Sequence, residues 1–91
     1  MRFYLPFDDV QFESAAQTHR EMRRHLSNLR EQYPPRSRRQ RELLRRYREI
    51  IQLFRAELLK PRGKIGPDVL NDLSATAAEC YVEYVMRRGV R

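Results

Sequence analysis

Cysteine and long apolar runs are scarce in this sequence. Cys80 is the single cysteine among 91 residues, which excludes an intramolecular disulfide and any metal site built from several thiolates. No stretch approaches the roughly 20 apolar residues of a membrane span, and the opening run MRFYLPFDD is too short for the core of a secretory signal. We therefore expect a cytoplasmic protein without a bound metal or cofactor.

Lysine is also scarce, with two residues against seventeen arginines, and the positive charge is unevenly distributed. Residues 34–64 hold nine Arg and two Lys against three Glu, a net charge of +8, whereas the segments on either side are close to neutral. Such a field attracts phosphate backbones, anionic membranes or acidic protein surfaces, and charge alone does not choose among them. The preference for arginine fits either guanidinium chemistry or the codon usage of a GC-rich genome.

The apolar residues recur at helical spacing in three segments, which predicts helices over residues 9–32, 37–60 and 67–88. Asp8 with Gln11, and Ser37 with Gln40, have the spacing of capping boxes, while Pro67 suits the first position of a helix. The expected core stripes are Phe12, Ala15, His19, Met22, Leu26, Leu29 and Tyr33; then Leu44, Tyr47, Ile51, Phe54 and Leu58, widened by Leu43 and Ile50; then Val69, Leu73, Ala77, Cys80 and Tyr84, broadened by Leu70, Tyr81 and Val85.

Short connections between these helices make each antiparallel to the next. We therefore expect a single all-α domain over residues 1–91, either a three-helix antiparallel bundle or a helical hairpin plus a third helix. The wide stripe of the second helix indicates that it packs against two neighbours. Sustained spacings of three and four also suit packing across a homodimer.

An extended arm is predicted for residues 1–7, because Pro6 forbids a helix there. Its apolar side chains are Phe3, Tyr4, Leu5 and Phe7. They can fold over their own bundle, or they can enter a groove on a second subunit or a partner as rigid anchors.

The arginines of the second helix are partly segregated on its surface. A helical wheel places five of them in one sector beside the apolar stripe, away from the glutamates: Arg38, Arg41, Arg45, Arg48 and Arg55. Such a row can bind phosphates or carboxylates bidentately. It can equally be a solvated face whose arginine stems only cover apolar surface.

No catalytic constellation is recognisable. His19 and His25 are six residues apart and project from different sides of a helix, and Cys80 lies on an apolar face where a buried thiol is ordinary. His19 falls within a core stripe, where a buried imidazole needs a hydrogen-bond partner and can sense pH. We therefore expect a protein that is not an enzyme.

These observations favour a small regulatory protein that binds and inhibits a protein partner, such as an anti-activator of a transcription regulator or an adaptor of bacterial or phage type. The partner-binding residues expected are Phe3, Tyr4, Leu5 and Phe7 as anchors, with Arg38, Arg41, Arg45 and Arg48 steering an acidic surface. The alternative is sequence-independent nucleic-acid binding by the same arginines. A membrane surface is disfavoured because the bundle needs the apolar stripe.

Overall fold

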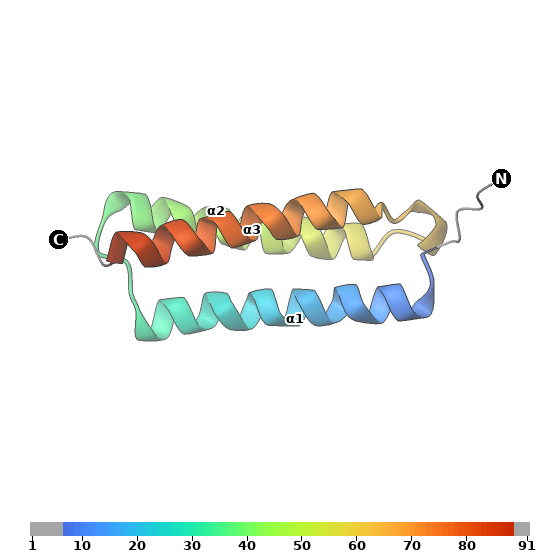
Figure 1. The fold of residues 1–91 in the computed structure, drawn as a ribbon, viewed down its shortest axis with the longest axis horizontal. Helices are drawn as coiled ribbons and strands as arrows, with labels where there is room; N and C mark the ends of the chain where they lie inside the picture. Colours follow the sequence, from blue (N-terminus) through green and yellow to red (C-terminus); the bar gives the residue numbers. More distant parts are fainter. Residues whose placement is uncertain (1–6, 89–91) are drawn as a thin grey trace.

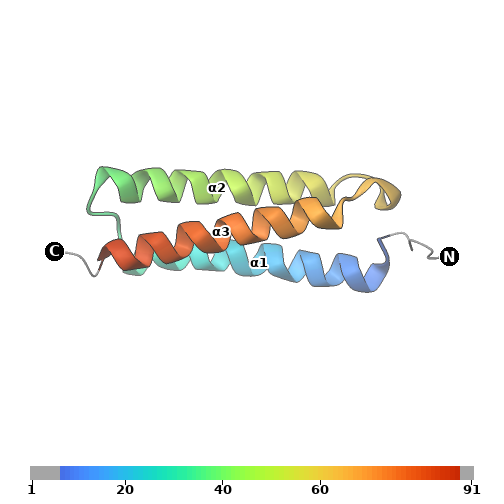
Figure 2. The same cartoon turned by 45° about the horizontal axis from the view of Figure 1, so that its top comes forward.

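The computed structural model describes residues 7–88, and this part of the chain contains three long helices and no strand. They are α1 (Asp9–Gln32), α2 (Arg38–Leu58) and α3 (Pro67–Arg88), with a short 3-10 helix η1 (Arg62–Lys64) before α3. Figures 1 and 2 show α1 and α3 running in one direction and α2 in the other. The predicted all-α three-helix bundle is confirmed, and it is elongated, measuring 55 × 24 × 16 Å.

The helix starts depend on the predicted caps, with one difference. The Gln11 amide donates to the Asp8 carboxylate over 2.7 Å, and the Asp8 amide donates to Gln11 Oε1 over 3.1 Å, so this capping box is complete. At α2 the backbone N–H of Gln40 donates to the Ser37 hydroxyl. The side-chain oxygen of Gln40, Oε1, accepts from the backbone N–H of Arg36 and not from that of Ser37, which a complete capping box would require. This leaves the side-chain Nε2 of Gln40 pointing into the bundle, where it can donate to another helix.

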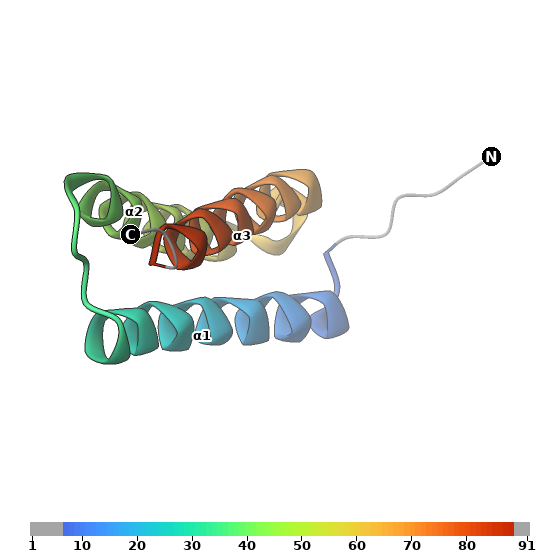
Figure 3. The same ribbon diagram turned by 60° about the vertical axis from the view of Figure 1, so that its left-hand side comes forward.

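The apolar side of α2 forms the centre of the bundle. Eight α2 residues are buried, against two in α1, and the eight are Gln40, Leu43, Tyr47, Ile50, Ile51, Phe54, Glu57 and Leu58. They occupy more than one side of the helix, so both α1 and α3 are needed to cover them. In Figure 3, α1 runs alongside the pair formed by α2 and α3.

The outer helices are less deeply buried than their stripes predict. In α1 only Met22 and Leu29 are buried, and Tyr33 at its end is exposed, because α1 packs chiefly on one edge of α2. The α3 side chains that face inward are Leu70, Ala77, Cys80 and Tyr84, with Leu73 partly buried. By contrast, Val69, Tyr81 and Val85, which were expected in the core, are exposed.

Polar contacts join the helices at the end where α1 stops and α2 starts. Gln40 Nε2 donates to the Tyr84 carbonyl of α3 over 3.3 Å, and the Tyr84 hydroxyl donates to the Tyr33 carbonyl. Gln40 and Tyr84 are almost completely buried, so the bond between them forms away from water, where an unpaired polar group is costly. This cluster fixes the end of α3 against both other helices.

A second set of contacts joins the opposite end. The buried Glu57 carboxylate accepts from the Gly66 amide over 2.9 Å and pairs with Lys60, which ties the end of α2 to the start of α3. These two contacts hold the pKa of Glu57 below its usual range. Arg62 lies over the Phe12 ring, 3.6 Å from its centroid, so the connection also contacts α1.

Replacing Tyr84 by Phe tests the first cluster, because it removes the hydroxyl and keeps the ring. We expect Tyr84→Phe to lower the free energy of unfolding by about 1 kcal/mol, and the melting temperature by about 4–8 °C. Tyr81→Phe is the matched control: Tyr81 is exposed and packs on His25 through its ring. Thermal denaturation followed by circular dichroism measures both, and equal effects of the two changes would contradict this role of Tyr84.

Candidate nucleic-acid or protein interface

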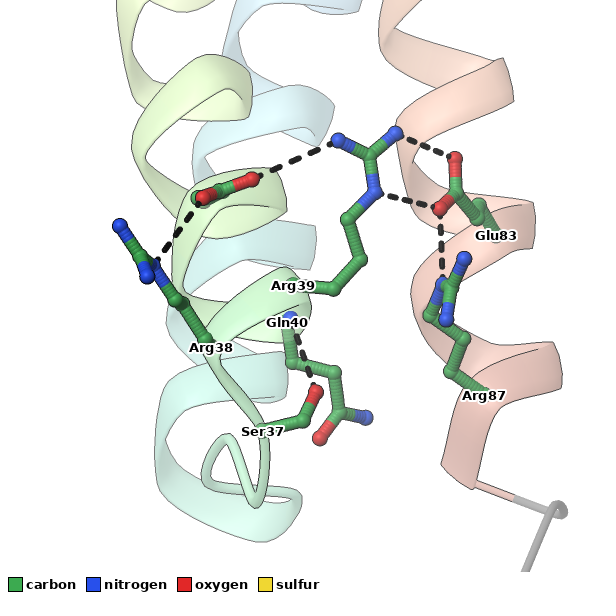
Figure 4. Close-up of polar contacts among 7 residues, drawn as sticks. Ser37, Arg38, Arg39, Gln40, Glu83 and Arg87 are labelled. Atoms are coloured by element: carbon green, nitrogen blue, oxygen red, sulfur yellow. Dashed lines mark hydrogen bonds and ion pairs between the residues drawn. The ribbon is translucent and has the colours of Figure 1, made fainter.

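Arg39, on the side of α2 that faces α3, is neutralised within the bundle. Arg39 makes a bidentate contact with Glu83 of α3, at 2.7 and 3.0 Å, and Glu83 also accepts from Arg87. Figure 4 shows Glu83 held between these two guanidinium groups. Their hydrogen bonds lower the pKa of Glu83 to about 2. This charge serves the packing of α2 on α3 and is not available to a partner.

The arginines on the other side of α2 remain unneutralised. Arg41, Arg45 and Arg48 are exposed, and in the described part of the chain no carboxylate oxygen lies within 4.0 Å of any of them. They recur at spacings of four and three, which places them in one row along the helix. Arg38, at the start of the predicted row, differs because it pairs with Glu42 at 3.7 Å.

This row borders a groove between α1 and α2. The groove has a volume of about 560 Å³ and is lined by Arg23, Leu26, Ser27, Arg30, Glu31, Arg48, Ile51 and Gln52. The partly buried Leu26 and the small exposed part of Ile51 supply apolar surface from the two helices, and three guanidinium groups and one carboxylate line the groove. The groove therefore combines apolar surface with positively charged walls on both sides.

Two of these arginines, Arg23 and Arg30 of α1, were not predicted as site residues. Each directly follows a buried residue, Met22 and Leu29, and the two are seven residues apart, so they lie on the same side of α1. That spacing was visible in the sequence. What the sequence did not reveal is that this side of α1 lies beside the arginine row of α2.

The predicted arm residues have two outcomes. Phe3, Tyr4 and Leu5 lie outside the described residues. Phe7 is only 8% exposed and belongs to the core of its own bundle, beside the groove between α1 and α3. Phe7 therefore packs on its own bundle, where its side chain is not exposed to a partner.

His19 occupies an electropositive part of the interface between α1 and α2. Its ring stacks on Phe54 with centroids 6.2 Å apart, and its Nε2 is buried without a hydrogen-bond partner among the described residues. Burial lowers the pKa of His19 below its usual value, and the positive charges of Arg23, Arg55 and Arg20 lower it further. The imidazole is therefore neutral near pH 7.

The described residues contain no group of three or more His, Cys, Asp or Glu side chains that could hold a metal ion. Cys80 is buried against α2, and burial raises the pKa of its thiol. A buried thiol with a raised pKa is a poor nucleophile.

Within the described part of the chain, none of the helices is both long and apolar enough to cross a membrane.

No protein-family model, curated protein or solved structure matches this chain.

Changing His19 to Leu tests how much stability the burial of its unpaired Nε2 costs. The unfolded chain binds a proton at His19 more readily than the folded chain, so the free energy of unfolding should fall as the pH drops from about 7 to about 5. We expect His19→Leu to flatten this fall and to add about 1 kcal/mol of stability at neutral pH. His25→Leu is the control, since His25 is exposed. Urea titrations at several pH values measure the slope, and an unchanged slope in His19→Leu would contradict this prediction.

Proposed function

We propose that this chain is a non-catalytic regulatory protein that binds an acidic, amphipathic segment of another protein in the groove between α1 and α2. Occupying such a segment keeps it from its other partners, so binding by itself is enough to inhibit. The observation that carries the proposal is the composition of the groove: Leu26 and Ile51 provide apolar surface between the guanidinium groups of Arg23, Arg30 and Arg48.

An amphipathic acidic helix matches both parts of this composition. Its apolar side chains can lie on Leu26 and Ile51 while its carboxylates reach the arginines on either wall. Arginine favours such contacts because its planar guanidinium binds a carboxylate bidentately. A phosphate backbone would satisfy the arginines but would leave the apolar surface uncovered.

The row of exposed arginines on α2, Arg41, Arg45 and Arg48, also supports fast association. Arg41 and Arg45 extend the positive surface from Arg48 toward the start of α2, beyond the residues that line the groove. Charges at the margin of an interface raise the association rate more than they lengthen the life of the complex. We therefore assign Arg41 and Arg45 to steering, and Arg23, Arg30 and Arg48 to contact.

Sequence-independent nucleic-acid binding is the second candidate. It is favoured by the regular spacing of Arg41, Arg45 and Arg48 without nearby carboxylates, which is a surface that phosphates can follow. The two candidates differ in their dependence on salt and on the apolar surface of the groove.

Neighbouring arginines of α1 provide a matched pair of variants. We expect Arg23→Glu and Arg48→Glu each to weaken binding of a synthetic acidic amphipathic peptide about tenfold, because each reverses a charge on one wall of the groove. Arg24→Glu makes the same change of charge at an exposed position outside the groove and should leave affinity within about twofold. Fluorescence anisotropy of the labelled peptide measures the dissociation constants, and equal losses in Arg23→Glu and Arg24→Glu would contradict a specific groove.

The same assay with an oligothymidylate and a DNA duplex separates the two candidates. The proposal predicts weaker binding to both nucleic acids than to the peptide, and a loss of peptide binding in Leu26→Ser without a loss of nucleic-acid binding, with circular dichroism verifying that the variant remains helical. Tighter binding to nucleic acid, falling about 20- to 40-fold or more between about 50 and 200 mM salt as three phosphate contacts require, would establish the second candidate instead.

A further inference from the structure

The α3 helix has an apolar surface on its outer side, separate from the stripe that it packs against α2. The side chains of this surface, which we name the outer seam, are Ala75, Ala78, Val82, Val85 and Met86. All five are exposed, with Val82 and Met86 at 54% and 66% of their full accessibility. The surface at Ala78, Val82 and Met86 is slightly hollowed.

The outer seam has the periodicity of a helix–helix interface. Ala75, Ala78, Val82 and Val85 are separated by three, four and three residues, the spacing that keeps side chains on one side of a helix facing another. The outer seam has the same spacing as the buried stripe of α3 but lies on the opposite side of the helix. A helix that is apolar on two sides packs against two neighbours. In this bundle α2 covers the inward stripe, and within the described residues α1 meets the outer seam only at the groove that Ala78 and Val82 line.

From this seam we infer that α3 pairs with α3 of a second copy of this chain, in antiparallel orientation about a two-fold axis level with Cys80. That axis places Ala78 opposite Val82 of the second copy, and Ala75 opposite Val85. A small side chain therefore meets a larger one at each level, which fills the interface evenly. A parallel pair would set Ala against Ala and Val against Val, leaving space in one half.

The charges of α3 favour the same orientation. The helix starts with Asp68 and has Asp72 one turn later, whereas Arg87 lies in its last turn. Antiparallel pairing opposes the two helix dipoles, and it brings Asp72 of one copy near Arg87 of the other, whose guanidinium can bind it in addition to Glu83 of its own chain. Parallel pairing would place the like ends of the two helix dipoles side by side.

The contact can extend beyond α3. Val82 also lines a groove between α1 and α3, together with Met22, His25 and Tyr81. A larger side chain from the second copy can enter this groove, which adds apolar area to a seam of about three helical turns. No residue of the outer seam lines the groove between α1 and α2, so the dimer leaves both copies of that groove open.

Sedimentation equilibrium over a range of concentrations tests the dimer. We expect the full chain to dimerise, and Val82→Glu to raise the dimer dissociation constant at least tenfold, because it places two carboxylates beside apolar side chains. Leu53→Glu is the matched control: Leu53 is a similarly exposed apolar residue of α2. Met86→Asp is a second seam variant, and circular dichroism verifies that all variants remain helical.

Disulfide trapping tests the orientation. In a Cys80→Ala background, Ala78→Cys and Val82→Cys chains are mixed and oxidised, and antiparallel pairing predicts that the mixed disulfide forms faster than either symmetric one. A monomer at every concentration, a dimer unaffected by Val82→Glu, or a predominance of Ala78→Cys paired with itself would each overturn the inference. None of these outcomes depends on peptide binding, so the groove between α1 and α2 is tested separately.

Discussion

The aromatic and branched side chains of α2 leave water only when both α1 and α3 cover them, because they occupy more than one side of the helix. In a chain of 91 residues this is the main apolar packing, so it sets how α1 and α3 lie around α2. Buried polar contacts at the two ends, through Gln40 and Tyr84 at one and Glu57 at the other, then fix how the helices are aligned.

This arrangement divides the positive charge of α2 into two groups with different consequences. On the side of α3, Arg39 is neutralised by Glu83, which strengthens the packing of these helices. On the side of α1 no carboxylate of the described residues pairs with Arg48, and the groove there is lined by Arg23 and Arg30 together with a single carboxylate, that of Glu31. Among the described residues, a carboxylate binds Arg39 on the α3 side of α2, whereas none pairs with Arg41, Arg45 or Arg48, so this edge of α2 stays positively charged and open. If α3 pairs with a second copy, a dimer carries two such edges, and a partner with two acidic segments gains avidity from both.

Helix bounds could be predicted from the sequence because the signals are local: Asp8, Ser37 and Pro67 mark helix starts, and prolines mark the connections. The central place of α2 followed from the width of its apolar stripe. The groove could be predicted only in part, since the row of α2 arginines is visible in one helix, whereas its pairing with α1 depends on how two helices are rotated and aligned. The exposure of Val85 was missed for a related reason: periodicity identifies an apolar surface but not which of two surfaces is covered.

The most direct test of this account is a map of amide chemical-shift changes in the ¹⁵N-labelled protein as an acidic amphipathic peptide is added. The account predicts that the largest changes fall on the facing sides of α1 and α2, around Leu26, Arg30 and Arg48, and that the outer side of α3 changes little. Changes concentrated on α3, or spread evenly over all exposed arginines, would contradict it.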